Sequence, residues 1–163
     1  MALLRMKVED IVVDENGHPV VLLKEESGYR ALPIWVGPTE ANAIKSELSG
    51  EKPPRPMTHD LMKQLLDLTG LRLIQMEVTD VRDDTYFAEL TFQVDEKPLQ
   101  KMDCRPSDGI ALALRTKSPM FISEELFARI ERERREARQA MEREREAEKR
   151  SGTRIEPGEP TIH

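Results

Sequence analysis

The stretch Met102-Asp103-Cys104-Arg105-Pro106-Ser107-Asp108-Gly109-Ile110-Ala111-Leu112-Ala113-Leu114 decides the fold of this chain. A strand-like run stops at Pro106, because proline cannot donate to a strand ladder, and Ser107 is a favoured helix-capping residue. Residues 110–114 are apolar on every side of a helix, so we expect this helix to be buried on a sheet. Four side chains suited to chemistry lie at the helix start: Asp103, Arg105, Ser107 and Asp108.

The same construction appears earlier, over residues 32–44. Here too a strand runs into a proline, a hydroxyl residue, a carboxylate and a helix. Sliding one copy onto the other aligns Pro38 with Pro106 and Glu40 with Asp108, and the upstream strands follow. We therefore predict an α+β fold in which a strand-strand-strand-helix unit is duplicated around one core, with helices packed on a largely antiparallel sheet.

The composition divides the chain into three parts. Residues 1–125 carry the apolar pattern of a folded domain, residues 126–150 form a helix rich in Glu and Arg, and residues 151–163 form a tail that we predict to be disordered. Opposite charges along the helix favour its formation, but the sequence has no sustained heptad repeat. A solvated helix is therefore preferred, and a helix that binds a protein partner is the alternative.

Charge and cysteine content narrow the functional classes. The formal net charge is −6, with most of the acidic excess before residue 123, which argues against tight binding of nucleic acid through a broadly basic face. A local basic cleft or a metal-assisted site stays open. The single cysteine excludes a disulfide framework. No apolar run is long enough to cross a membrane and no signal peptide pattern is present, so we expect a cytoplasmic protein.

A proline-rich loop, residues 49–57, separates the two copies. It leads into a helix that Thr58 should cap and that Gly70 should end. This loop and helix belong to neither copy. Because rigid inserted loops often carry function, the segment is a candidate part of a site.

Three motifs resemble the bifunctional nuclease family, a group of bacterial and plant domains described as cutting both DNA and RNA. They are Pro56-Met57-Thr58-His59-Asp60, residues 103–108 and residues 32–41. The likeness runs from about Met6 to Glu125 and keeps the motifs in order. It implies a mixed domain that hydrolyses phosphodiester bonds, but it brings no established nucleophile or metal ligands. Some relatives append an interaction module where this chain has only a charged helix and a tail.

Asp103 and Asp108 flank the strand-to-helix junction, where side chains converge on the end of a sheet. Paired carboxylates at such a place could hold Mg²⁺ or Mn²⁺, which would polarise a phosphate and activate a water molecule. The structural alternative is that Asp108 complements the helix N-terminus while Asp103 pairs with Arg105 or Arg55.

His59 and Asp60 lie at the other predicted helix start. The other two histidines, His18 and His163, lie in a turn and at the C-terminus, so His59 is the candidate general base or acid. In the alternative reading Thr58 caps the helix, Asp60 complements its dipole and His59 is structural.

Arg55 and Arg105 each stand next to a proline, which would aim their guanidinium groups rigidly at a phosphate. Ser107 would join them in substrate binding. The alternative is an ion pair with Asp60 or Asp103. Weaker candidates are Arg30, Glu40 and Lys101.

For two further residues the sequence indicates a place in the core. Cys104 is interpreted as a small buried hydrophobe and not as a nucleophile. Trp35 is interpreted as a core residue and not as a platform for a nucleobase.

We therefore predict a nuclease-like phosphodiester hydrolase whose site lies around residues 103–108, near residues 55–60. The alternative is a non-catalytic regulatory or protein-interaction domain that docks on a larger assembly, as the acidic charge and the charged helix would allow. The short run at residues 120–122 is predicted to form no more than an edge strand, and the sheet edges that it leaves also predict assembly into a homo-oligomer.

Overall fold

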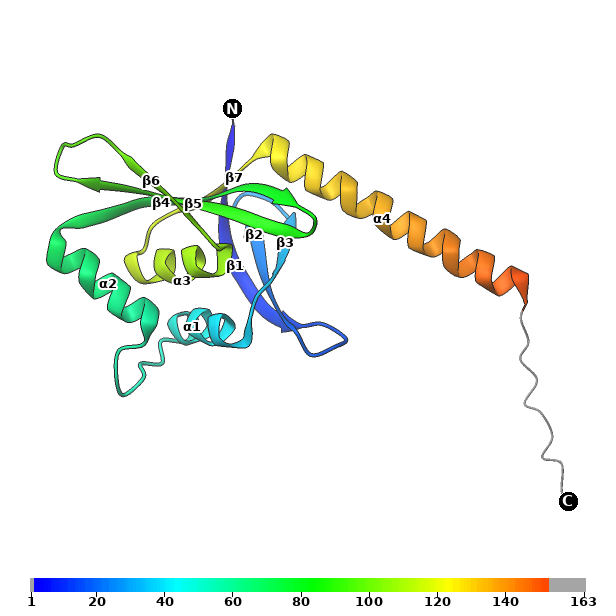
Figure 1. The fold of residues 1–163 in the computed structure, drawn as a ribbon, viewed down its shortest axis with the longest axis horizontal. Helices are drawn as coiled ribbons and strands as arrows, with labels where there is room; N and C mark the ends of the chain where they lie inside the picture. The colour runs from blue at the N-terminus through cyan, green and yellow to red at the C-terminus, as the bar shows by residue number, and fades with distance from the viewer. Residues whose placement is uncertain (1, 153–163) are drawn as a thin grey trace, which may run out of the picture. The chain divides into compact units, whose positions relative to one another are not determined.

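The computed structural model describes residues 2–152, which form a mixed α+β fold (Figure 1). The strands are β1 (Leu3–Val13), β2 (Pro19–Glu25), β3 (Ala31–Trp35), β4 (Leu71–Arg82), β5 (Thr85–Val94), β6 (Gln100–Cys104) and β7 (Met120–Ser123). The helices are α1 (Pro38–Ser49), α2 (Thr58–Thr69), α3 (Pro106–Thr116) and α4 (Glu124–Ser151). None of these helices has both the length and the apolar character that a membrane crossing requires.

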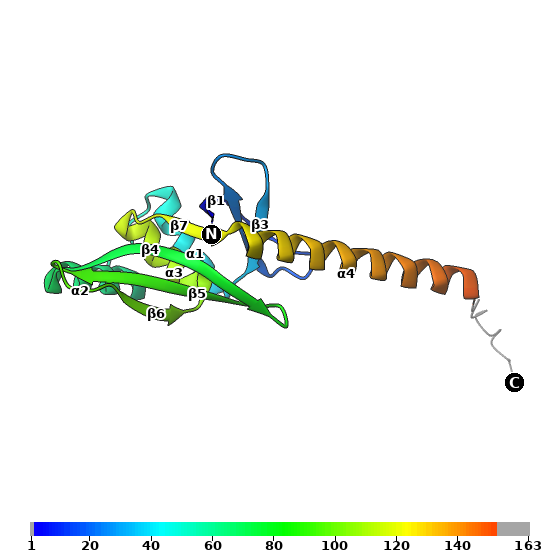
Figure 2. The same ribbon diagram turned by 90° about the horizontal axis from the view of Figure 1, so that it is seen from above.

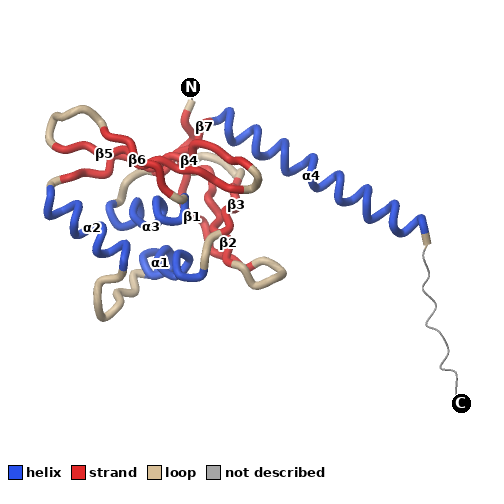
Figure 3. The backbone as a smooth tube through the Cα atoms, in the orientation of Figure 1, coloured by secondary structure: helices blue, strands red, loops and turns tan. Residues whose placement is uncertain are grey.

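All seven strands join one sheet in the order β3-β2-β1-β7-β4-β5-β6 (Figure 3). Each neighbouring pair is antiparallel except β4 and β7, which are parallel. Two three-stranded meanders therefore stand on either side of the short strand β7. The predicted place of this strand at a sheet edge is wrong, because β7 pairs with β1 on one side and with β4 on the other. The α+β class and the largely antiparallel sheet that the sequence predicts are confirmed.

The two meanders share a local irregularity at aligned positions. The register shifts between Val8 and Asp10 in β1, and between Val78 and Asp80 in β4. At each shift the aspartate Oδ1 accepts a hydrogen bond of 2.8 Å from the backbone N–H of the following residue. The shared irregularity agrees with an internal duplication, which stays a prediction.

The core forms where α3 lies on β4 and β5. Ile110, Ala111, Leu112 and Ala113 are almost fully buried, as the apolar run predicts. At Gly109 the approach is so close that an added Cβ would lie 3.0 Å from Met76 Cγ and 3.1 Å from Cys104 Sγ. Both α1 and α2 pack against α3, so the three helices form one group beside the sheet (Figure 2).

Two predicted caps are wrong, because α3 begins two residues earlier and α2 one residue earlier than the capping pattern suggests. Arg105 is the N-cap of α3, Pro106 takes the first helical position, and Ser107 is buried. Proline is favoured at that position because the first N–H of a helix has no intrahelical partner. Met57 is the N-cap of α2, and Asp60 Oδ2 accepts its backbone N–H at 2.9 Å.

The chain divides into a compact unit, Met1–Phe127, and a second unit that begins at Ala128. The charged C-terminal helix that the sequence predicts is present as α4. Ser123 Oγ accepts the backbone N–H of Leu126 at 3.1 Å and so caps the start of that helix. The end of the predicted tail, from residue 153, lies outside the described residues.

Candidate active site

The N-terminal turns of α1, α2 and α3 open onto one pocket of about 560 Å³. Helix starts present unpaired N–H groups and a positive dipole end, which favours an anion. The charged and imidazole side chains on its wall are Glu40, Glu51, Lys52, His59, Arg105, Asp108 and Arg115. The two strand-to-helix corners that the sequence aligns, one carrying Glu40 and the other Asp108, thus open onto the same pocket.

His59 and Asp108 meet at the wall of this pocket. The imidazole Nε2 lies 2.9 Å from Asp108 Oδ1, across 49 residues of sequence. His59 is buried, with an exposed fraction of 7%. The predicted proximity of residues 55–60 and 103–108 is confirmed by this contact.

The contact with Asp108 fixes which nitrogen of His59 faces away. A carboxylate only accepts hydrogen bonds, so Nε2 donates, and in the neutral ring Nδ1 then carries a lone pair. Within residues 2–152 no buried side-chain nitrogen or oxygen lacks a partner. No hydrogen bond of His59 Nδ1 occurs within the same residues, so Nδ1 is accessible to solvent.

Arg105 holds the other side of the Asp108 carboxylate. Its Nε donates to Oδ2 at 2.7 Å and its Nη2 to Oδ1 at 3.1 Å. Burial opposes the charge of Asp108, but the hydrogen bonds from Arg105 and His59 outweigh it and hold the pKa of Asp108 below its usual value. Asp108 is therefore ionised and can stabilise a positive charge on His59.

Arg105 also joins the two aligned corners. Its Nη2 lies 3.0 Å from Glu40 Oε1, so the carboxylates of α1 and α3 converge on one guanidinium group. The Arg105 side chain is nevertheless 65% exposed. It can therefore bind a phosphate while it keeps Asp108 in place.

Asp60 belongs to a separate, structural ion pair. Its pKa is lowered by the hydrogen bond from the Met57 backbone and then by Arg115, whose Nε donates to Oδ1 at 2.7 Å. Arg115 also donates to the carbonyls of Ala111 and Ala43. The alternative in which Asp60 pairs with Arg55 is wrong, since Arg115 takes that place. Sequence reasoning missed Arg115, although a lone arginine on an apolar helix signals a buried partner.

Asp103 does not converge with Asp108, so the predicted pair of metal ligands is wrong. Asp103 lies opposite Glu89 and Cys104 opposite Ala88 in the β5–β6 ladder. Neighbouring strand residues point to opposite faces, and Cys104 Sγ faces the start of α3. Asp103 therefore points to the other face of the sheet. The described residues hold no group of three or more His, Cys, Asp or Glu side chains arranged for a metal ion.

The remaining candidates lie apart from the His59 contact. Arg55 is exposed in the loop between α1 and α2. Burial raises the pKa of the Cys104 thiol to about 12, and the charges of Asp108 and Asp103 act in the same direction, which leaves it unsuited to nucleophilic attack. Arg30 pairs with Glu25 and Glu124, and Lys101 pairs with Glu89.

Trp35 is exposed, and its predicted place in the core is wrong. It stands at the end of β3, an edge strand whose inward residues are Leu32 and Ile34. The side chain is 53% exposed and its Nε1–H donates to Asp14 Oδ2 at 3.0 Å. Alternation along β3 puts Trp35 on the face opposite that of Leu32 and Ile34.

Comparison with known proteins places the chain in a family. A family model described as the bifunctional nuclease domain matches residues 21–134. An uncharacterized protein of Mycobacterium tuberculosis is 40% identical over 124 residues, which cover 76% of this chain and 73% of that protein. Bifunctional nuclease 1 of Arabidopsis thaliana is 29% identical over 116 residues, which cover 69% of this chain and 36% of the plant protein. Bifunctional nuclease 1 of Oryza sativa subsp. japonica is 27% identical over 108 residues, or 65% of this chain and 33% of the rice protein. This chain therefore belongs to the bifunctional nuclease domain family.

Proposed function

We propose that this protein hydrolyses phosphodiester bonds of DNA or RNA, and that the pocket at the starts of α1, α2 and α3 is its active site. The observation that carries the proposal is the His59–Asp108 contact on a pocket wall that also presents Arg105. The names of the plant relatives support the same activity.

In the proposed reaction the scissile phosphate binds to the exposed part of Arg105 and to the helix starts. A water molecule attacks phosphorus as His59 Nδ1 takes one of its protons. The bond from phosphorus to the leaving oxygen breaks, and that oxygen takes the proton from the imidazolium. Asp108 orients the ring and stabilises its positive charge throughout, as a carboxylate does for a catalytic histidine.

A metal-assisted form of this reaction would use two carboxylates of the pocket. Glu40 and Asp108 are the pocket carboxylates nearest to Arg105, and such oxygens suit Mg²⁺ or Mn²⁺. In the structure both carboxylates pair with the guanidinium of Arg105. The ion would supply charge that stabilises the phosphate and a water molecule of lowered pKa.

The test is cleavage of labelled single-stranded DNA and RNA by wild type, His59→Gln and Lys63→Gln, each purified by the same route. Lys63 lies on α2 with His59 but pairs with Asp67 and does not line this pocket, so its substitution is the matched control. We expect His59→Gln to lose at least about 100-fold in rate and the control to keep its rate. Equal cleavage by all three would contradict the proposal. Loss of the wild-type rate in EDTA would place the divalent ion in the reaction.

The second candidate function is protein interaction, and one surface favours it. Leu61, Leu65 and Leu68 are 53%, 52% and 83% exposed, and their spacing places them in one row along α2. An exposed apolar row of this kind is typical of a contact between proteins. The homo-oligomer that the sequence predicts could therefore use α2 as well as a sheet edge. Light scattering of wild type and Leu65→Glu tests this, since an oligomer held by α2 would dissociate in the variant.

A further inference from the structure

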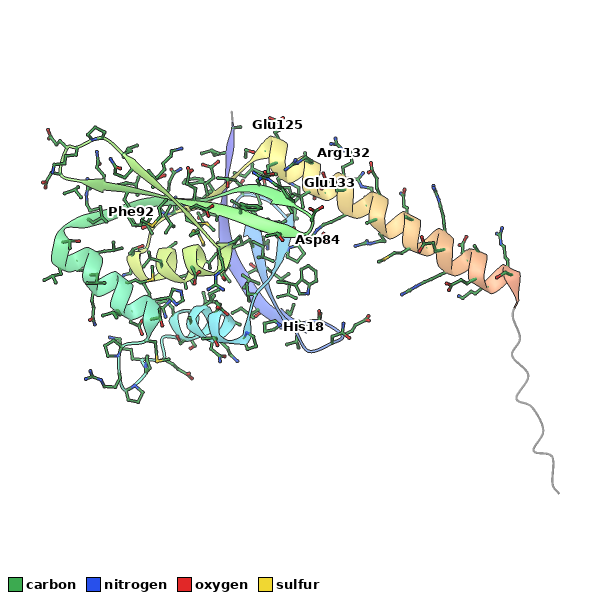
Figure 4. The ribbon with its side chains drawn as sticks, in the orientation of Figure 1. His18, Asp84, Phe92, Glu125, Arg132 and Glu133 are labelled. Carbon is green, nitrogen blue, oxygen red and sulfur yellow. The ribbon has the colours of Figure 1, made fainter. Side chains whose placement is uncertain are left out.

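A second pocket, of about 400 Å³, shares Arg105 with the candidate active site. Its wall comes from the β1–β2 turn, the end of β3, the β4–β5 turn and the start of α3. The side chains that matter here are His18, Trp35, Asp84, Tyr86, Arg105 and Ser107. His18 and Asp84 lie near the turns of two hairpins (Figure 4). A nucleic acid bound at Arg105 thus has a second hollow beside it.

Trp35 is held as a fixed surface in this pocket. Its Nε1–H donates to Asp14 Oδ2, while Asp14 Oδ1 accepts the backbone N–H groups of Asn16 and His18 at 2.9 Å. The β1–β2 turn therefore anchors the indole through one carboxylate. An exposed aromatic ring that is fixed before binding loses little conformational entropy when a ligand stacks on it.

The chemistry of the wall fits a nucleobase better than a phosphate. Trp35 and Tyr86 supply aromatic rings, and aromatic side chains and arginine planes are what unpaired bases stack on. The carboxylate of Asp84 would repel a phosphate, but it can accept a hydrogen bond from a base amino group. Stacking also needs no excess of positive charge, which suits a chain of net charge −6.

We propose that this pocket binds one unpaired nucleobase, stacked on Trp35, while Arg105 binds the adjacent scissile phosphate. The inference rests on the proposed function, because Arg105 is what connects the two pockets. It makes single-stranded nucleic acid the substrate class. A base inside a duplex is stacked and paired with its neighbours, and it would have to leave the helix to reach the Trp35 ring.

The binding test uses the fluorescence of Trp35, the only tryptophan of the chain. The full-length His59→Gln variant, which leaves the strand uncut, is titrated with a six-nucleotide oligothymidylate and with a twelve-base-pair DNA duplex. We expect saturable quenching by the single strand and little by the duplex. Unchanged fluorescence with the oligothymidylate, or equal quenching by both probes, would overturn the inference.

The kinetic test compares Trp35→Leu with Trp35→Phe. Loss of the stacking surface should raise the KM for single-stranded substrate about tenfold in Trp35→Leu and leave kcat nearly unchanged, the size expected for one lost base–aromatic stack. Trp35→Phe keeps a ring but lacks the hydrogen bond to Asp14, so it should recover most of the lost affinity. An equal loss in both variants would show that the hydrogen bond and the turn matter instead of stacking, and the inference would fall.

The two proposals fail in different ways. If wild type cuts single strands while the oligothymidylate leaves Trp35 fluorescence unchanged and Trp35→Leu keeps the wild-type KM, the base pocket is wrong and the active site survives. If wild type cuts no strand but the oligothymidylate still quenches Trp35 and the duplex does not, the base pocket stands and the hydrolase does not.

Discussion

The starts of α1 and α3 have the same backbone but different chemistry. Both N-caps are extended, with φ −71° and ψ 159° at Gly37 and φ −68° and ψ 142° at Arg105. Both helices then begin with proline and carry a carboxylate in the first turn, Glu40 in α1 and Asp108 in α3. The local sequence pattern therefore builds the same corner twice.

The difference lies in the residue before proline. Glu40 folds over Gly37, where an added Cβ would lie 2.3 Å from Glu40 Oε2. At the other corner Arg105 has a side chain that reaches both Glu40 and Asp108, and Asp108 alone also contacts His59. The comparison teaches that the repeated corner supplies the scaffold, whereas Arg105 and the inserted helix α2 supply the groups to which we assign the proposed catalysis.

The largest expected effect is a difference in cleavage rate between substitutions at the two corners. Asp108→Asn removes the charge that supports His59 and should lower kcat for single-strand cleavage by at least about 100-fold. Glu40→Gln removes only a partner of Arg105, and we expect less than about a tenfold loss. Steady-state cleavage assays of the two variants check this. Equal losses would mean that both carboxylates act alike, for example as ligands of one metal ion.

A smaller effect concerns the packing that positions α2 for the Asp108 corner. Arg115 has a side chain only 5% exposed, and it holds Asp60 at the start of α2. Arg115→Met should lower the free energy of unfolding by about 3 kcal/mol, because Asp60 loses its partner. Urea unfolding followed by circular dichroism measures the change. Arg72→Met on the exposed surface of β4 is the control, and an equal loss there would contradict the assignment.

The pH dependence of stability should also separate the corners. The folded-state pKa of Asp108 lies below its unfolded value, so the stability that its contacts supply is present above the unfolded pKa. It is lost as the pH falls through the folded pKa. The unfolding free energy of wild type minus that of Asp108→Asn should therefore decrease by about 1 kcal/mol between pH 6 and pH 2. An unchanged difference across this range would show that the Asp108 contacts do not stabilise its charged form.

The smallest effect concerns the glycine at the α1 corner. In Gly37→Ala the new methyl group would displace the carboxylate end of Glu40, which is flexible and can move away. We expect a change of less than about 0.5 kcal/mol in the free energy of unfolding. Thermal unfolding measures it. A loss of several kcal/mol would mean that the folded-over Glu40 is a structural requirement of this corner.

The corners could be predicted because their signals are local. A strand, a proline and a carboxylate before an apolar run define where a helix starts, and two such starts on one core imply a shared pocket. For the contact between His59 and Asp108, only the proximity of the two segments could be predicted. The sequence does not say which carboxylate the imidazole contacts.

The residues whose predicted positions are wrong are those whose positions depend on strand alternation or on strand order. Placing Cys104 in the core already implies that Asp103 points the other way, because adjacent strand residues alternate. Trp35 is exposed because it faces away from the buried Leu32 and Ile34 at the end of β3, an edge strand, and strand order is a property of the whole fold. The partner of Arg115 likewise lies 55 residues away, on another helix.

The central claim is that the Asp108 corner hydrolyses phosphodiester bonds, and its most direct test is a matched pair of aspartate substitutions. Asp108→Asn and Asp103→Asn change the same chemical group five residues apart, on opposite faces of the sheet. In single-turnover cleavage of a labelled single strand, Asp108→Asn should lose nearly all of the wild-type rate while Asp103→Asn keeps it. Equal rates in the two variants, or a loss confined to Asp103→Asn, would contradict the claim.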